Sequence, residues 1–455
     1  MDGMIENRTQ TDLTRVLAGK ASTLGYDGLP APVRELARQC ILDYLGVARA
    51  GAQDPLVLIL LDEITEAGGS PQAAVIGHSA RLPALSAALV NGAAAHALDY
   101  DDVNMAMPGH PSVAILPGLL ALAELKGSSG REVITAFVAG YETACRVGAA
   151  LQPGHYNLGF HSTSTVGSFG AAAACARLLG LDAETTAMAL GIAGTQASGL
   201  KSQFGTMCKP FHAGKAAQNG LLAARLAARG FSSRTDLVEC VQGFALTHGP
   251  DFTPEAALAT PEAGFHVLAN LFKYHAACYF THAPIECARR LRDEHRLTRD
   301  VIAGITLKLD ASCDRVCNIP VPVDGLQSKF SLRQTVAMAL SGVDTASLDA
   351  YSAENARDPG LVRLRERLKF DWQDNWPQTL SEIEIELVDG RRVSARHDAG
   401  TPAADIANQG QRLAAKFDAL VAPVRGAARA RELREMISGL ENVTDIGSLA
   451  RLAAC

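Results

Sequence analysis

Residues 164–180 read STVGSFGAAAACARLLG. Alanine and leucine are strong helix formers, and the small side chains allow neighbouring helices to approach closely. Similar stretches rich in Ala, Gly and Leu recur along the chain, each bounded by Gly, Pro, Ser or Asp, and aromatic residues make up only 5% of the sequence. This pattern predicts a mainly α protein with helices over 30–48, 83–98, 112–126, 130–151, 164–180, 184–200, 213–229 and 283–296.

The character of the sequence changes after about residue 265. Residues 302–309, IAGITLKL, alternate as a strand does, and residues 382–388 and 391–396 alternate on either side of Asp389-Gly390, a strong hairpin signal. Residues 404–453 again have a helical pattern. We therefore predict an all-helical domain over 1–266, which the helices of 404–455 could complete, and a smaller α+β lid domain over 267–403.

Length and composition exclude several classes of protein. A chain of 455 residues exceeds the size of one hydrophobic core, so more than one domain is expected. The net charge of −6 without a basic stripe argues against nucleic-acid binding. The sequence has no signal-peptide pattern, no uninterrupted apolar span and no CxxC pair among its ten cysteines. We expect a cytoplasmic protein with no membrane contact and with reduced, buried thiols.

Cationic side chains lie just before four expected helix starts. They are His110 before Pro111, His161 before Ser162, Lys209 with His212 before a helix expected from Ala213, and His282 before Ala283. A helix N-terminus binds anions, so a cation there does not stabilise the helix. A single such histidine is more often an ordinary loop residue, but four together predict sites that face a bound carboxylate.

The segment His96–Ser112, HALDYDDVNMAMPGHPS, is the densest polar segment of the N-terminal half. His96 and Asp99 are three residues apart, as on one face of a helix, and carboxylates near the end of that helix are electrostatically unfavourable. This local conflict predicts that the segment forms one wall of an active site. Met105 stands where an aspartate-rich metal motif needs a further acid, so we predict no metal and leave Asp101 and Asp102 in supporting roles.

A second polar segment, FKYHAACYFTHAPIE, covers residues 272–286. Lys273 could hold a carboxylate. Cys278 could carry a proton or be an unreactive buried thiol, and no activating neighbour is visible in the sequence.

Six stretches of the sequence, in this order, resemble the MmgE/PrpD family, which contains 2-methylcitrate dehydratase, cis-aconitate decarboxylase and iminodisuccinate epimerase. They are VNGAAAHALDYDD (90–102), GHPS (109–112), FHSTSTVGSFGAAAA (160–174), FGTMCKPFHAGKAAQNG (204–220), FKYHAACYFTH (272–282) and KFSL (329–332). The resemblance implies a large helical domain with an α+β lid, a homodimer, and a site in the cleft between the domains that needs neither metal nor cofactor.

By position, the resemblance implies catalytic roles for Asp99, His110, His161 and Lys209. It also implies a site role for Lys273, and we expect substrate contacts by Lys273, Cys278, His212 and His282. Cys278 and Val103 stand where the decarboxylase branch of the family carries histidine and threonine. The residues GHYNLGFH (154–161) and FGTMCKP (204–210) are closer to the epimerase branch.

The shared chemistry of the family is removal of a proton next to a carboxylate. We expect His161 or His110 to take the proton and Lys209 and Lys273 to hold carboxylates. Asp99 is expected to orient a histidine or to act as a second acid–base group. We expect a hydro-lyase first, an epimerase or isomerase of a substituted succinate as the alternative, and a decarboxylase third. Two other classes stay open: a metal-dependent helical enzyme such as a terpene cyclase, and a binding protein that has lost catalysis.

Overall fold

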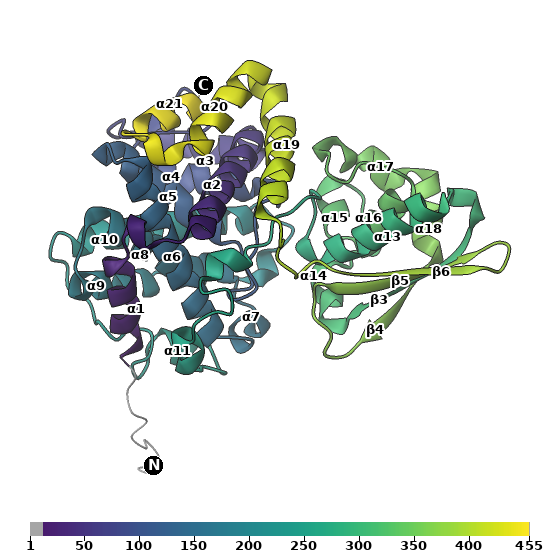
Figure 1. Ribbon diagram of the computed structural model, residues 1–455, viewed down its shortest axis with the longest axis horizontal. Coiled ribbons are helices and arrows are strands. Elements are labelled where there is room, and N and C mark those ends of the chain that lie inside the picture. The colour runs from purple at the N-terminus through teal and green to yellow at the C-terminus, as the bar shows by residue number, and fades with distance from the viewer. Residues whose placement is uncertain (1–11, 455) are drawn as a thin grey trace, which may run out of the picture. The chain divides into compact units, whose positions relative to one another are not determined.

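The structure is a computed structural model that describes residues 12–454. The chain forms two compact units, Met1–Asn270 together with Ala403–Cys455, and Leu271–Pro402. The first unit is almost entirely helical, and the second combines helices with a four-stranded sheet. The prediction of a mainly α fold with a smaller mixed domain is confirmed (Figure 1).

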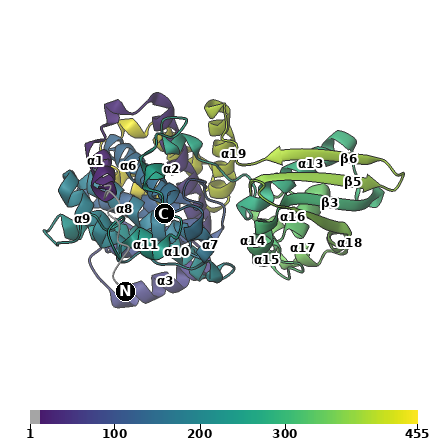
Figure 2. The ribbon, with the colours of Figure 1, turned by 90° about the horizontal axis from the view of Figure 1, so that it is seen from below.

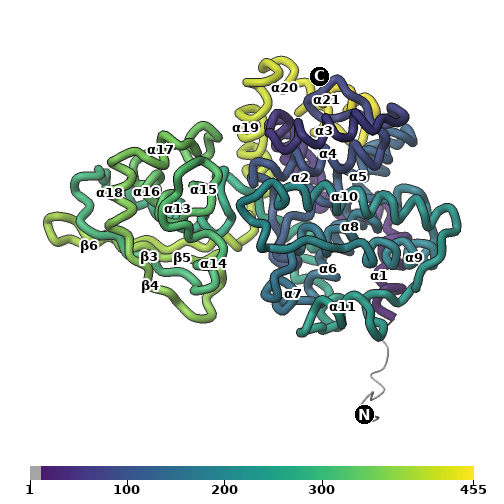
Figure 3. Tube along the Cα trace, turned by 180° about the vertical axis from the view of Figure 1, so that it is seen from behind, coloured from purple at the N-terminus to yellow at the C-terminus, as the bar shows by residue number. Residues whose placement is uncertain are grey.

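Helix α10 lies at the centre of the first unit and packs against α4, α5, α8 and α9, while α8 also packs against α6. Figure 3 shows α8 and α10 running side by side. The principal helices of the unit before residue 270 are α1 (Leu13–Thr23), α2 (Ala31–Gly51), α3 (Pro55–Ala67), α4 (Ala84–Ala97), α5 (Pro111–Lys126), α6 (Gly130–Ala150), α8 (Ser162–Leu179), α9 (Ala183–Gly194) and α10 (Cys208–Ala227). Its shorter elements are α7 (Gly154–Leu158), α11 (Phe244–His248), α12 (Pro254–Leu258), β1 (Ala73–Ala74) and β2 (Arg81–Leu82).

Glycines allow the central helices to touch through their backbones. A Cβ atom on Gly92 of α4 would lie 2.6 Å from the Cα atom of Gly214 in α10, and one on Gly118 of α5 would lie 2.7 Å from the carbonyl oxygen of Ala217. These separations leave no room for a side chain. The small residues of the sequence are therefore required by the closeness of the helices.

The C-terminal segment completes the first unit with α19 (Ile406–Arg425), α20 (Ala427–Ser438) and α21 (Gly447–Ala454). Helix α19 packs against α2. The Lys416 ammonium of α19 donates to Asp43 Oδ1 of α2 at 2.6 Å and to the carbonyl oxygen of Tyr100 at 2.7 Å. A buried ion pair thus connects the end of the chain to the polar segment His96–Ser112.

The second unit contains a sheet in the order β4-β3-β5-β6. Its strands are β3 (Ile302–Asp310), β4 (Leu368–Gln373), β5 (Leu380–Leu387) and β6 (Arg392–Asp398). The predicted hairpin is confirmed, since β5 and β6 pair antiparallel around Gly390, whose φ of 84° suits glycine. Strand β4, which pairs parallel to β3, was not predicted.

Helices of the second unit cover one face of this sheet (Figure 2). Helix α13 (His282–His295) packs against β5 and β6 and against α16 (Leu332–Leu340), which in turn contacts α18 (Pro359–Arg367). The apolar side chains of the strands, including Ile305, Leu307 and Ile383, are buried. The remaining helices are α14 (Asp314–Cys317), α15 (Gly325–Lys329) and α17 (Ala353–Arg357).

Two of the predicted helix limits were wrong. Helix α9 ends at Gly194 rather than near residue 200, and α10 begins at Cys208 rather than at Ala213. Cys208 is exposed, contrary to the expectation of buried thiols, whereas the other described cysteines are buried, and none of them forms a disulfide. No helix within residues 12–454 is by itself long and apolar enough to cross a membrane; α2 and α3 meet that criterion only as a pair, bent by 83°.

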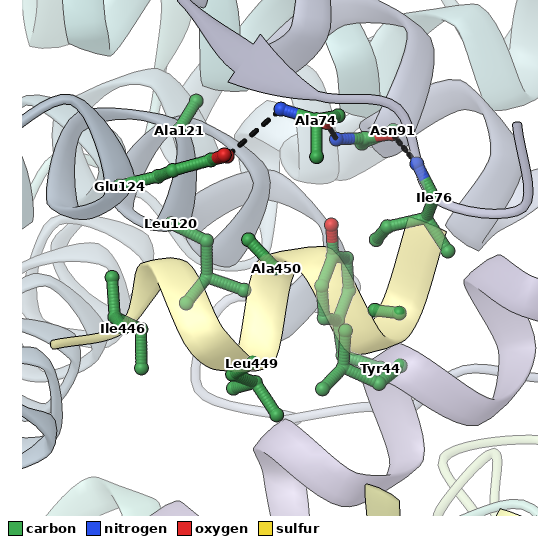
Figure 4. Close-up of a pocket in the computed structure, with 12 residues that line it drawn as sticks. Tyr44, Ala74, Ile76, Asn91, Leu120, Ala121, Glu124, Ile446, Leu449 and Ala450 are labelled. Atoms are coloured by element: carbon green, nitrogen blue, oxygen red, sulfur yellow. Dashed lines mark hydrogen bonds between the residues drawn. The ribbon is translucent and has the colours of Figure 1, made fainter. Parts of the chain in front are cut away.

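Helix α21 covers a small cavity lined by residues of α2, α4 and α5 (Figure 4). Tyr44 of α2 is 1% exposed there, and its hydroxyl has no hydrogen-bond partner among the described residues. Burying a hydroxyl without a partner destabilises a protein by about 1–3 kcal/mol.

We therefore expect Tyr44→Phe to leave the free energy of unfolding unchanged or to raise it by about 1 kcal/mol. Urea denaturation followed by circular dichroism measures this change, with Tyr141→Phe as the matched control. The Tyr141 hydroxyl donates to Asn270 Oδ1 at 2.6 Å, so its removal should destabilise the protein. A loss above 1 kcal/mol in Tyr44→Phe would contradict the expectation.

Candidate active site

Four helix ends of the first unit meet at one buried cluster of polar side chains. His96 lies in the last turn of α4, and Lys209 lies in the first turn of α10. His110 is the N-cap residue of α5, and His161 is the N-cap residue of α8. The two predicted N-cap histidines are confirmed at their helix starts. Lys209 and His212 instead lie inside α10, and His282 is the first residue of α13, so the prediction that they precede their helices was wrong.

Asp101 bridges two of the histidines. Its carboxylate accepts from His96 Nδ1 at 3.0 Å and lies 3.0 Å from His110 Nδ1. His110 Nδ1 also donates to the carbonyl oxygen of Asp102 at 2.8 Å, which requires the proton of His110 to be on Nδ1. The Nε2 atom of His110 is consequently left as the proton acceptor.

Burial opposes the ionisation of Asp101, which is 1% exposed, but the interactions with His96 and His110 outweigh it and hold the pKa of the carboxyl well below its usual value. The same burial lowers the pKa of His96 to about 4, although Asp101 favours its protonation. At neutral pH the bridge therefore consists of one carboxylate and two hydrogen-bonded imidazoles, of which His96 is neutral.

Asp99 and Lys209 form a buried ion pair beside this bridge. Lys209 Nζ lies 2.6 Å from Asp99 Oδ1 and 3.3 Å from His96 Nε2, and Asp99 Oδ1 lies 4.0 Å from His110 Nε2. Asp99 follows the end of α4 with a φ of 52°, an uncommon conformation for a residue other than glycine. The expectation that His96 and Asp99 share a helix face was therefore wrong, although both side chains reach Lys209.

His161 and His212 form the other side of the cluster, with their Nδ1 atoms 3.0 Å apart. Burial, together with the nearby His96 and Lys209, lowers the pKa of His161 well below its usual value, and burial lowers that of His212 to about 4. The Phe204 ring packs edge-on against His161, with 5.0 Å between ring centres. Both imidazoles are thus neutral at physiological pH and can accept a proton.

Asp102 occupies a different environment from Asp101. It accepts from the Ser112 hydroxyl at 2.5 Å and from the Ser112 amide at 3.3 Å. Burial, reinforced by the carboxylates of Asp43 and Asp101, raises the pKa of Asp102 to about 7. The supporting role predicted for both aspartates fits the contacts of Asp102, whereas Asp101 contacts two imidazoles of the cluster directly.

Four of these side chains could also hold a metal ion. His96, Asp99, Asp101 and His110 each offer one ligand atom, and these atoms all lie within 4.8 Å of one another. The Lys209 ammonium, however, already faces two of them, Asp99 Oδ1 and His96 Nε2. A divalent cation bound there would be repelled by the ammonium, so the contacts favour lysine as the positive charge of the cluster.

The other predicted substrate-binding residues belong to the second unit. Lys273, Cys278 and His282 are all buried there. The neighbouring His275 has two polar partners. Its Nε2 atom lies 3.0 Å from Glu286 Oε1, and its Nδ1 atom lies 2.8 Å from the Thr345 hydroxyl oxygen. Their roles in substrate binding stay predictions.

Of the two neighbouring aspartates, Asp102 should titrate between pH 5 and pH 8 and Asp101 should stay ionised over that range. Because the folded-state pKa of Asp102 is about 7 and its ordinary value is 3.8, the stability that Asp102 contributes is present at pH 4 and is lost as the pH rises through 7. Asn cannot titrate. The quantity to compare is the free energy of unfolding of Asp102→Asn minus that of the parent protein. We expect this difference to increase by about 3 kcal/mol between pH 5 and pH 8, in favour of the variant.

Asp101→Asn is the matched control. It removes the ionised acceptor of two imidazoles at both pH values, so it should destabilise the protein at pH 5 and pH 8 alike. Urea denaturation of the three proteins measures the difference. Parallel pH profiles for Asp102→Asn and the parent protein would show that Asp102 is already ionised below pH 5.

Comparison with known proteins identifies the family of the chain. The MmgE/PrpD N-terminal domain matches residues 15–257, and the MmgE/PrpD C-terminal domain matches residues 275–442. A cis-aconitate decarboxylase of Aspergillus terreus is 27% identical over 480 residues, covering 99% of this chain and 97% of that protein. The cis-aconitate decarboxylase of Homo sapiens is 29% identical over 385 residues, covering 80% of this chain and 79% of that protein. The chain is therefore an enzyme that belongs to the MmgE/PrpD family.

Proposed function

We propose that this enzyme removes a proton from the carbon next to a carboxylate in a small di- or tricarboxylate, without a metal ion. The observation that carries the proposal is the set of buried, neutral imidazoles arranged around the ion pair of Lys209 and Asp99. A neutral imidazole is a competent general base, and a fixed ammonium stabilises the negative charge that develops on the substrate carboxylate.

In the proposed reaction, His161 or His110 takes the proton. The electron pair of the C–H bond moves toward the carboxylate, where Lys209 stabilises it. When the adjacent carbon carries a hydroxyl group, this pair forms a C=C bond as the C–O bond breaks, and the hydroxyl leaves as water with a proton supplied by the enzyme. Asp99 orients Lys209 in this scheme, and Asp101 positions His96 and His110.

Dehydration of a 2-methylcitrate-like tricarboxylate is our first candidate. It uses both a base and a proton donor, as the paired histidines and the Lys209–Asp99 pair can supply. Cys278 and Val103 stand where the resemblance places a histidine and a threonine in decarboxylases, which argues against loss of carbon dioxide.

Decarboxylation is the second candidate, because the relatives described above are named cis-aconitate decarboxylases. Epimerisation of a substituted succinate is the other alternative. It is supported by residues 154–161 and 204–210, which are closer to the epimerase branch.

The remaining roles rest on the resemblance. The one ammonium described in the histidine cluster, that of Lys209, already pairs with Asp99, so a polycarboxylate requires further positive charge. We propose Lys273 as that second cation, with His212, His282 and Cys278 as substrate contacts. We also propose that the enzyme is a cytoplasmic homodimer.

The three reactions leave different products. We expect enzyme incubated in D2O with 2-methylcitrate to yield an unsaturated tricarboxylate, detected by proton NMR and near-ultraviolet absorbance. A decarboxylase would release one carbon dioxide per turnover from cis-aconitate. An epimerase would exchange the α-proton of its substrate for deuterium and lose neither water nor carbon dioxide. Turnover that chelator abolishes, or no reaction with any of the three substrate types, would contradict the proposal.

The pH profile tests the state of the base. Because the pKa of His161 lies well below 6.5, we expect kcat/KM to stay constant between pH 8 and pH 6.5 and to decrease only at pH values below 6.5. His161→Ala should lower kcat by about 10²–10⁴-fold. Lys209→Ala should lower kcat/KM strongly.

His295→Ala and Lys369→Ala are the matched controls, since both side chains are exposed in the second unit. Full turnover in folded His161→Ala and Lys209→Ala would refute the assignment of these residues. If kcat/KM already decreases as the pH is lowered to 6.5, the base is not an imidazole whose pKa is lowered by burial.

A further inference from the structure

A second cavity, of about 480 Å³, lies in the first unit beside α1, α6 and the segment 260–265. Among the described residues that line it, none belongs to the histidine cluster. The residues that line the cavity include three with large apolar side chains, Leu17, Leu24 and Phe265. A volume of this size is within the range of small-molecule sites in proteins, which are about 300–1,000 Å³.

Arg146 of α6 places a buried guanidinium at this cavity. The residue is 8% exposed, and its Nη1 donates to the carbonyl oxygens of Ala257 at 2.8 Å and Ala259 at 2.9 Å. These two bonds hold the guanidinium in one position. The described residues accept no hydrogen bond from Nε or Nη2, so three of the five N–H donors are left for a ligand. A guanidinium fixed in this way is suited to a carboxylate.

The other charged groups of the lining leave the cavity positive. Lys20, near the end of α1, is exposed. Glu142 accepts from the Val267 amide at 3.1 Å, and burial raises the pKa of its carboxyl to about 7. His266, which neighbours Arg146, has its pKa lowered to about 4 by burial and is neutral. Two cations thus face one partly protonated carboxyl group near neutral pH.

We propose that this cavity is a second binding site, for a small organic carboxylate with an apolar body. Its carboxylate binds Arg146 and Lys20, and its hydrocarbon or aromatic part lies against Leu17, Leu24 and Phe265. The apolar lining residues distinguish this ligand from an inorganic anion, which would leave those side chains without a partner.

Isothermal titration of the full chain with octanoate at pH 7 tests the site, with inorganic phosphate as the comparison probe. We expect one octanoate per chain, with phosphate binding at least tenfold more weakly. Lys20→Glu reverses the charge at the cavity, and Thr23→Trp places a bulky ring on an exposed residue of its lining. Each variant should weaken octanoate binding at least tenfold.

Two controls identify where octanoate binds. Lys369→Glu makes the same charge change on an exposed residue of β4 and should leave the affinity unchanged. Lys209→Met alters the histidine cluster and should also leave it unchanged. The proposal is overturned if octanoate does not saturate the protein in the millimolar range or if phosphate binds as tightly. It is also overturned if Lys20→Glu and Thr23→Trp have no effect, or if Lys209→Met abolishes binding.

Discussion

The close backbone packing of α4, α5, α8 and α10 is the constraint on which the site depends. A side chain on Gly214 of α10 would meet the carbonyl oxygen of Leu89 at 2.2 Å, and one on Gly220 would meet the Cβ atom of Ala171 in α8 at 2.3 Å. Helices that touch at such points cannot slide or rotate without collisions. Their ends are therefore held together, and those ends carry His96, His110, His161 and Lys209.

The same packing sets the protonation states of the cluster. Exclusion of water penalises every charge, so only groups with close partners stay ionised: Asp101 between two imidazoles, and Lys209 against Asp99. The imidazoles of His96, His161 and His212 are kept neutral by burial. An anionic substrate brought beside a neutral imidazole raises its affinity for a proton, so substrate binding itself would favour transfer of the proton from carbon to the base.

Much of this arrangement could be predicted from the sequence, because it is local. The N-cap positions of His110 and His161 follow from the prolines, serines and glycines around them. Lys209 was placed before its helix because that helix was expected to begin at Ala213. The helix α10 instead begins at Cys208, and Pro210 is tolerated there because it lies in the first turn. The role of Asp101 could not be predicted, since it depends on His110 arriving from the start of another helix. The prediction from helix spacing instead paired His96 with Asp99, which lies beyond the helix end.

The polar segment that follows α4 is also held by a part of the chain more than 300 residues later. Lys416 contacts the Tyr100 carbonyl oxygen and lies 4.0 Å from the centre of the Tyr100 ring, while it pairs with Asp43. Tyr100 separates Asp99, which pairs with Lys209, from Asp101, which pairs with the histidines. Because both aspartates are positioned by the backbone on either side of Tyr100, the Lys416 contact restrains both at once. The C-terminal helices are thus part of the structure that positions the site, and the return of the chain to the first unit has a direct chemical consequence.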